Sequence, residues 1–498
     1  MISCICVGIL LAGCARRPYV TPRAALDYGQ FTLRQLPPEV ELEALRGKRI
    51  VIDPGHGGVF AGAVGPNNLR EADVNLGVGL YLWGMLTQAG AEASLTRVSD
   101  SNVYQGDDLN LRNDLQARAE YARARQADLF LSLHHNADVL PGAKKNSLET
   151  YFKMSDPGPS LDAARSIHRQ LALSLGQADN VILPGNFRVL RESPTTAILG
   201  EPSYISHADN AFRLGLAPMQ RLEAQAYFLG IAEYFSKGVP EIKDVKPTGT
   251  IRDDSRPLIA ARVIADRNVA IEPDSVTMLI DGRPVEAEFD QETSQLMHLP
   301  TRRLSNGKHT IWMSLRNVNG NAARPAESEI EITMPPAYLL LSSNFRTLPP
   351  SSMQPIRLSA RVFDADLMPV ADGTPVGFNA SSGTVSPNVA LTRNGEAVTY
   401  ITPEKDSTSR EITTSANTSG LTHSLTLSLT EDAPQIIVTN VLDAKTKLPV
   451  ERALVSAGDR PLGYSDRTGY FAVTHAEISD SPIAFSRPGY ATQELSLS

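Results

Sequence analysis

The spacing of apolar residues changes at Gly238, and this change divides the chain into two regions of different fold class. Before it, short apolar runs alternate with segments in which apolar residues recur every three or four positions, which is the pattern of strands alternating with helices. After it, short alternating segments are separated by turn signals such as Asp281-Gly282, and no long helical pattern occurs. We therefore expect an N-terminal α/β domain followed by all-β modules.

The individual strands and helices of the α/β region can be predicted from its apolar residues. Residues 50–52 and 129–133 are predicted to be buried strands, and Ile198-Leu199 predicts a third short strand. Apolar residues at steps of three or four predict two helices between the first two strands and a third helix that closes the domain. The positions that define these helices are Val74, Val78, Leu82 and Leu86; Leu111, Leu115, Ala119 and Ala122; and Leu222, Ala226, Leu229 and Tyr234.

Composition narrows the classes of function. Lys and Arg number 47 against 55 Asp and Glu, so the net charge is −8, the wrong sign for a general nucleic-acid binder. The three cysteines are Cys4, Cys6 and Cys14, and the rest of the chain has none. A metal site in the folded domains must therefore use His, Asp or Glu rather than thiolate ligands.

The N-terminus predicts export. Residues 2–14 form an uncharged apolar run that is shorter than the roughly 20 residues of a spanning helix but suits the core of a signal peptide. The run ends in LAGC at 11–14, which resembles the lipobox of bacterial lipoproteins. This resemblance implies a signal peptide at 1–14, lipidation of Cys14 and a tether at 15–46. The protein would be an exported, lipid-anchored component of the bacterial cell envelope, facing the periplasm.

Three β-sandwich modules are expected after an α/β domain of residues 47–240. Residues 244–335 carry two hairpin-type turns flanked by alternating segments and fit one sandwich. In residues 337–431, PVGF is followed by GTVSP, which resembles the bacterial Ig-like modules of invasin-type surface proteins. In residues 434–498, DRTGYF and PGY resemble the carboxypeptidase-regulatory, transthyretin-like β-sandwich.

The residues suited to chemistry follow strands of the α/β domain. The sequence IVIDPGHGG at 50–58 places His56 just beyond the end of a strand, and His134 follows the second strand, at the edge where open α/β sheets bind ligands. Glu71 precedes the first helix, and Glu201 ends the third strand. Two imidazoles and a carboxylate complete a zinc site that keeps its fourth position open for water, as catalytic zinc sites do.

These segments also match a family. IVIDPGHGG, Glu71, SLHHNA at 132–137, the Glu after an apolar strand and Arg118 resemble the zinc-dependent N-acetylmuramoyl-L-alanine amidases of bacterial cell walls. The resemblance covers about 48–237 and implies a twisted, mainly parallel sheet wrapped by helices. It further implies a Zn²⁺ ion and hydrolysis of the amide between N-acetylmuramic acid and L-alanine in peptidoglycan. By this resemblance His56, Glu71 and His134 ligate the metal, and Glu201 is the catalytic carboxylate.

Two histidines depart from the family pattern. His135 stands where the family usually has a small residue, and His207 replaces an Asn that follows the catalytic Glu. Successive residues of a strand point to opposite faces, so we interpret His135 as a buried histidine beside the ligands and not as a ligand. His207 lies near the site in sequence and has no assigned role.

Two other functions remain open on the residues alone. One is a peptidoglycan-binding adhesin or scaffold lipoprotein with weak catalysis or none, and the other is a zinc hydrolase of a different envelope amide. The presence of Glu201 favours an enzyme, because a binding module does not need it. The β modules would position the domain and contact envelope proteins.

The segment after His134 indicates whether access to the metal site is expected to be blocked. Some amidases of this family carry a long insertion here that folds a helix over the zinc. Residues 136–149 are short and interrupted by Pro141-Gly142, so we expect no such cover and activity without an activator. Glu149 is the one nearby carboxylate that could block the metal.

Overall fold

The computed structural model describes residues 37–38, 40–138, 146–176, 179–404, 409–478 and 482–495. The expected signal peptide and Cys14 lie outside these residues. The chain divides into two compact units. The first extends to Lys246 and includes residues 260–298 and 311–328, and the second comprises 247–259, 299–310 and the remainder from 329.

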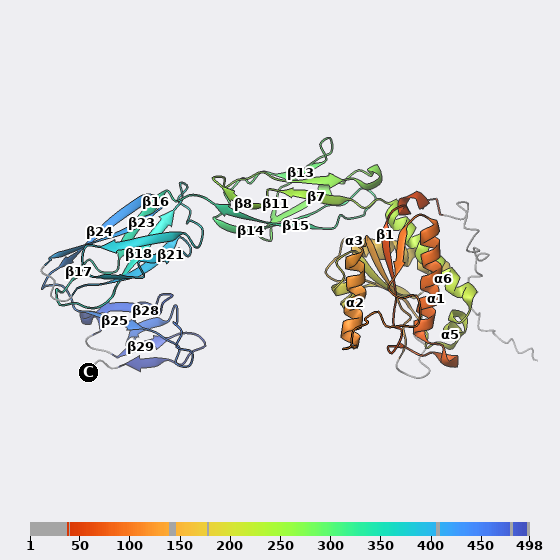
Figure 1. Ribbon diagram of the computed structural model, residues 1–498, viewed down its shortest axis with the longest axis horizontal. Helices are drawn as coiled ribbons and strands as arrows, with labels where there is room; N and C mark the ends of the chain where they lie inside the picture. Colours follow the sequence, from red (N-terminus) through yellow and green to blue (C-terminus); the bar gives the residue numbers. More distant parts are fainter. Residues whose placement is uncertain are drawn as a thin grey trace, which may run out of the picture. The chain divides into compact units, whose positions relative to one another are not determined.

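The α/β domain contains a six-stranded sheet with the strand order β2-β1-β3-β6-β4-β5. Figure 1 shows this sheet, which includes β1, at the centre of the domain. All neighbouring strands are parallel except β4 and β6, which are antiparallel. The expectation of a mainly parallel sheet is confirmed. The strands are β1 (Arg49–Pro54), β2 (Glu92–Leu95), β3 (Leu129–Leu133), β4 (Leu148–Lys153), β5 (Asn180–Gly185) and β6 (Ala197–Glu201).

The three expected helices are present, and the structure adds three more. The four apolar positions that predicted the first helix are all fully buried. Leu111 was predicted to be part of the buried stripe of the second helix, but it is 52% exposed because it is the first residue of that helix. The helices are α1 (Glu71–Gln88), α2 (Leu111–Ala124), α3 (Pro159–Leu175), α4 (Arg188–Arg191), α5 (Ala208–Leu214) and α6 (Ala217–Ser236).

The helices cover both faces of the sheet (Figure 1). Ile50 and Ile52 of β1 belong to an apolar cluster built with α1, α3 and α6. Val51, which points to the opposite face, packs in a second cluster with residues of α2 and α4. The sheet is therefore buried on both sides, and its polar side chains gather at the ends of its strands.

The region after Gly238 is all-β in the residues that the structure describes, since it contains strands and single 3₁₀ turns but no α-helix. This confirms the change of fold class read from the sequence. Among the described residues, no helix of the protein is both long enough and apolar enough to cross a membrane.

The first β region contains a five-stranded sheet, ordered β11-β10-β14-β15-β8, and a four-stranded sheet, ordered β12-β13-β9-β7. The pair β15 and β8 is parallel. The strands are β7 (Glu241–Lys246), β8 (Gly249–Arg252), β9 (Ile259–Ile264), β10 (Thr277–Ile280), β11 (Arg283–Val285), β12 (Glu288–Asp290), β13 (Gln295–His298), β14 (Gly307–Ser314) and β15 (Ala326–Thr333).

The later strands form four further sheets, ordered β16-β18-β22-β20, β17-β24-β23-β19-β21, β25-β28 and β27-β26-β29-β30. The first two sheets of this set share one apolar core. Their strands are β16 (Tyr338–Ser343), β17 (Thr347–Leu348), β18 (Ile356–Phe363), β19 (Pro375–Ala380), β20 (Thr384–Ser386), β21 (Val389–Leu391), β22 (Glu396–Thr402), β23 (Glu411–Thr418) and β24 (Leu421–Leu429). The final strands are β25 (Ile436–Asn440), β26 (Leu454–Ala457), β27 (Arg460–Tyr464), β28 (Tyr470–Thr474), β29 (Ile483–Ser486) and β30 (Gln493–Leu495).

Within the first unit, the loop between β14 and β15 packs against the C-terminal end of α6. The buried side chain of Asn321 donates hydrogen bonds to the carbonyl oxygens of Tyr234, at 2.8 Å, and Gly238, at 2.7 Å. Asn317 donates to the carbonyl oxygens of Lys237 and Gly238. The polypeptide that leaves the α/β domain is thus fixed by two buried asparagines.

Replacing Asn321 by alanine is expected to lower the free energy of unfolding by about 1 to 3 kcal/mol, because two buried carbonyl groups lose a donor. Urea unfolding of the full chain measures the change in the free energy of unfolding. Asn319→Ala is the matched control, since Asn319 lies in the same loop but is exposed and makes one 3.3 Å hydrogen bond to Lys237. Equal losses in the two variants would contradict the role given to Asn321.

Candidate metal centre

His56 lies in a tight turn directly after β1. Its φ angle is 64°, in the left-handed region that few non-glycine residues adopt. Two buried arginines fix the turn: Arg118 donates to the carbonyl oxygen of His56 at 2.8 Å, and Arg97 donates to that of Gly55 at 2.9 Å. A Cβ atom at Gly55 would lie 2.3 Å from His134 Nε2, so only glycine allows the two strand ends to approach this closely.

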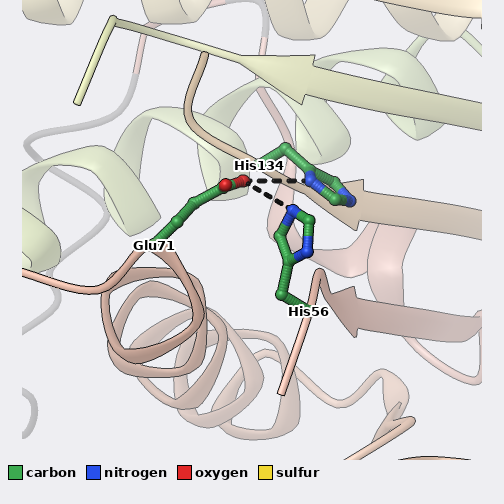
Figure 2. Close-up of side chains that lie close together, drawn as sticks. All are labelled: His56, Glu71 and His134. Atoms are coloured by element: carbon green, nitrogen blue, oxygen red, sulfur yellow. Dashed lines mark hydrogen bonds and ion pairs between the residues drawn. The ribbon is translucent and has the colours of Figure 1, made fainter. Parts of the chain in front are cut away.

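Glu71 and His134 complete a cluster with His56 (Figure 2). Glu71 is the first residue of α1 and is buried, and its Oε1 atom lies 3.1 Å from His56 Nε2 and 3.1 Å from His134 Nδ1. One ligand atom from each of the three residues falls within 4.8 Å of the others. The other oxygen of Glu71 accepts a 2.9 Å hydrogen bond from the backbone N–H of Ala63, which orients the carboxylate.

Electrostatics suit these groups to a metal cation. Burial alone would raise the pKa of Glu71, but hydrogen bonds and charge interactions with His134 and His56 hold it far below its usual range. Burial lowers the pKa of His134, which favours the neutral imidazole that ligates metals. Two imidazoles and one ionised carboxylate at this spacing fit a zinc ion with one position left open.

Glu201 stands at the end of β6, outside the group of three. Its Oε2 atom is buried and has no hydrogen-bond partner among the described residues. Burial, followed by the negative charges of Glu71 and Glu149, raises the pKa of Glu201 well above its ordinary value. A carboxyl group with a raised pKa beside a metal site is suited to take up and return a proton.

Glu149 lies on β4 directly opposite Glu201 in the antiparallel pair. Its buried carboxylate accepts hydrogen bonds from the hydroxyls of Tyr204, at 3.0 Å, and Tyr151, at 2.7 Å. Asn136 and Ser147 donate two more. The carboxylate is thus held in a hydrogen-bond network beside Glu201, an arrangement that favours a structural role over that of a mobile plug.

Replacing Glu149 by alanine is therefore expected to reduce stability by about 1 to 3 kcal/mol, because the buried hydroxyl of Tyr204 loses this acceptor. Turnover of a soluble muropeptide should not rise. Thermal unfolding and a turnover assay on the same preparation measure both effects. A large activation in the variant would show that Glu149 inhibits the enzyme.

The two histidines that depart from the family pattern, His135 and His207, differ in their surroundings. The side chain of His135 is buried and lies between Asn75 and Glu223, and it is not one of the three clustered side chains. Burial alone would lower the pKa of His135, but the charge and hydrogen bond of Glu223 raise it. His207 precedes α5, and its buried Nδ1 atom has no partner among the described residues.

Sequence reasoning missed Asn75 and Glu223. Asn75 lies four residues after Glu71 on α1, so both side chains share one helix face, and this spacing was a usable signal. Glu223 is an acid beside Leu222, on a helix whose neighbouring positions are apolar, and an acid in such a stripe indicates a buried partner. The sequence does not identify that partner.

Comparison with known proteins agrees with the family resemblance that was noted in the sequence. Residues 50–233 match the family model described as N-acetylmuramoyl-L-alanine amidase. The uncharacterized protein YqiI of Bacillus subtilis (strain 168) is 34% identical over 196 residues, covering 39% of this chain and 88% of that protein. The sporulation-specific N-acetylmuramoyl-L-alanine amidase of the same organism is 31% identical over 190 residues, covering 38% of this chain and 68% of that protein.

Two further matches are a relative of which this chain covers a smaller share and a protein of known structure. N-acetylmuramoyl-L-alanine amidase LytC of Bacillus subtilis (strain 168) is 34% identical over 190 residues, which make up 38% of this chain but only 36% of LytC. The solved structure of N-acetylmuramoyl-L-alanine amidase AmiC2 of Nostoc punctiforme is 31% identical, with a TM-score of 0.33, over 38% of this chain and 96% of that one. All of these matches span only about two-fifths of this chain.

Proposed function

The chain belongs to the N-acetylmuramoyl-L-alanine amidase family, and from this we propose that it is a zinc enzyme that cleaves the amide between N-acetylmuramic acid and L-alanine in peptidoglycan. The observation that carries the proposal is the cluster of His56, Glu71 and His134 at one edge of the sheet, with Glu201 at the end of a neighbouring strand. A module that only bound peptidoglycan would need neither the metal-binding group nor the buried carboxyl.

The residues divide the chemistry between them. A zinc ion held by His56, Glu71 and His134 would supply Lewis acidity, which polarises the scissile carbonyl and lowers the pKa of the attacking water. Glu201 takes the proton from the attacking water as the new C–O bond forms. It then returns that proton to the nitrogen of L-alanine as the C–N bond breaks. The products are a lactyl carboxylate on the glycan and a stem peptide with a free amine.

The hydrogen-bond network around the site keeps these groups in place. Glu149 is fixed by four donors and faces Glu201 across two paired strands. Its negative charge contributes to the raised pKa of Glu201. After Glu201 has accepted a proton, this environment favours keeping it until the leaving nitrogen requires it.

We also propose that the enzyme acts in the bacterial envelope, anchored through a lipid on Cys14, and that its β modules contact other envelope components. The apolar run that ends at Cys14 supports the anchor. Mass analysis of the mature N-terminus tests it, and the expected result is a diacylglycerol-modified cysteine. A mature protein without lipid mass would contradict the anchor and leave the proposed hydrolysis unaffected.

Metal removal tests the enzymatic proposal. Dialysis of the full chain against 1,10-phenanthroline should abolish turnover of a soluble muropeptide, and one equivalent of zinc should restore it. A binding module would show no turnover before or after zinc is added. Full turnover in protein shown by atomic spectroscopy to be free of metal would contradict the zinc assignment.

A further inference from the structure

His135 occupies an unusual position for a residue beside a metal ligand. It is 1% exposed and lies where β3, α1 and α6 meet. Its Nδ1 atom is 2.8 Å from the side-chain oxygen of Asn75 on α1, and its Nε2 atom is 3.1 Å from Oε2 of Glu223 on α6. One imidazole ring therefore links two helices to the end of the strand that carries His134.

The orientation of Asn75 follows from its other contacts. Its side-chain nitrogen donates to the carbonyl oxygen of Gly55, at 3.3 Å, and to Oε1 of Glu71, at 3.4 Å. The side-chain oxygen of Asn75 must then accept, so Nδ1 of His135 donates to it. A continuous path of contacts runs from Glu223 through His135 and Asn75 to Glu71.

Glu71 is the end point of this path. Its Oε1 atom contacts His56 and His134, and it also accepts a 3.1 Å hydrogen bond from the backbone N–H of His135. His135 therefore approaches Glu71 twice, directly through its backbone and indirectly through Asn75. Displacement of His135 would therefore disturb both contacts.

Stabilisation of the folded protein is a poor explanation for the pair of His135 and Glu223. Glu223 is buried. Among the described residues, His135 is the only hydrogen-bond partner of its carboxylate, and its Oε1 atom has no partner. Glu233, a buried acid ten residues later on the same helix, contacts Arg169, Gln170 and Lys237. Burying a carboxyl group with so few hydrogen-bond partners is unfavourable, so a role at the neighbouring site is the better explanation.

We propose that His135 and Glu223 are positioning residues, which hold Asn75 and the backbone of the strand end so that Glu71 faces His56 and His134. This inference rests on the proposed metal site. Partners behind a metal ligand fix its orientation, and their loss typically weakens metal binding by about 10- to 100-fold. Glu223 is contributed by α6, so the helix that closes the domain also completes the support of the site.

The test compares zinc affinities in the full chain by competition with a chelator. Glu223→Leu removes the acceptor and should weaken zinc binding by about 10- to 100-fold. Glu223→Gln, which keeps an acceptor oxygen, should restore most of the affinity. His135→Ala breaks the same pair from the other side, so the test survives if the leucine variant fails to fold. The visible spectrum of the Co²⁺-substituted protein should change in both disruptive variants.

Matched controls separate positioning from general destabilisation. Glu233→Leu makes the same change on the same helix, and His168→Ala removes a buried histidine that contacts Thr150 and Asn180. Both controls should lower the melting temperature and leave the zinc affinity and the Co²⁺ spectrum unchanged. Folded Glu223→Leu or His135→Ala protein with wild-type affinity and spectrum overturns the inference.

The wild type and His134→Ala are measured in the same series, so failure of the proposed function can be recognised. A wild type that binds no zinc overturns both the metal site and this inference. A wild type that binds zinc, a His134→Ala variant that does not, and unaffected pair variants overturn the inference alone.

Discussion

Replacing His134 by alanine is expected to abolish stoichiometric zinc binding and, with it, amidase turnover. His134 supplies one of three clustered ligand atoms, and its ring lies 3.1 Å from the carboxylate of Glu71. Two remaining protein ligands cannot complete the site that a catalytic zinc requires. The loss should exceed the about 10- to 100-fold effect typical of a supporting residue.

Atomic spectroscopy of the purified variant, with the wild type alongside, measures the metal content. His168→Ala is the control, because His168 is also buried in the α/β domain but contacts only Thr150 and Asn180 in the described hydrogen-bond network. It should retain one zinc per chain. One equivalent of zinc in folded His134→Ala protein would show that this residue is not a ligand.

Glu201→Gln is expected to keep its zinc, unlike His134→Ala, but to lose turnover. Glutamine has nearly the same shape but cannot take a proton from water. General acid–base groups typically contribute about 10²- to 10⁴-fold, so turnover of a soluble muropeptide should fall by that order. Zinc content and turnover measured on the same preparation test both parts. Loss of zinc together with activity would indicate that Glu201 is a ligand.

The same substitution should stabilise the metal-free protein. The pKa of Glu201 in the folded state lies above its value of about 4.3 in an unfolded chain, so ionisation opposes folding. The stability that Glu201 contributes is present at low pH and is lost as the pH rises toward the raised pKa. Glutamine carries no charge, so at neutral pH the metal-free variant should have a higher free energy of unfolding than the metal-free wild type.

This stabilisation should shrink as the pH falls toward about 4, where the unfolded carboxyl is itself protonated. Urea unfolding at several pH values, with metal removed, measures it. Glu120→Gln on α2 is the control, because Glu120 is exposed and should show little change. A variant less stable than the wild type at neutral pH would contradict the raised pKa assigned to Glu201.

The four residues proposed for chemistry were predictable because of a simple property of parallel sheets. His56 and His134 follow β1 and β3, which pair in parallel, and Glu201 ends β6, the next strand along. Their side chains therefore reach the same edge whatever the details of packing. Glu71 follows from its place at the start of α1, beside that edge.

The supporting residues were not predictable in the same way. Glu223 lies 88 residues after His135, and the two meet only because α6 packs beside α1 over one face of the sheet. The pairing of Glu149 with Glu201 depends on β4 running antiparallel to β6, a reversal that the apolar pattern does not encode. Helix packing and strand direction, rather than local spacing, decide these contacts.

The sequence predicted the class of each half of the chain but not the order of its strands. The alternating pattern after Gly238 indicated all-β structure, and the described residues there form only strands and 3₁₀ turns. It could not indicate that β15 pairs in parallel with β8, because pairing across many residues depends on which apolar faces meet. The family resemblance covers the α/β domain, so it says nothing about these sheets.

The most direct test of the central claim is the identity of the bond that is cut. Purified sacculi should be incubated with the zinc-loaded full chain, and the released products identified by mass spectrometry, with Glu201→Gln as the inactive control. The proposal predicts free stem peptides with an N-terminal L-alanine amine, and glycan whose N-acetylmuramic acid carries an unsubstituted lactyl carboxylate. Sacculi that stay intact, or products cut at any other bond, in the presence of one bound zinc per chain would contradict it.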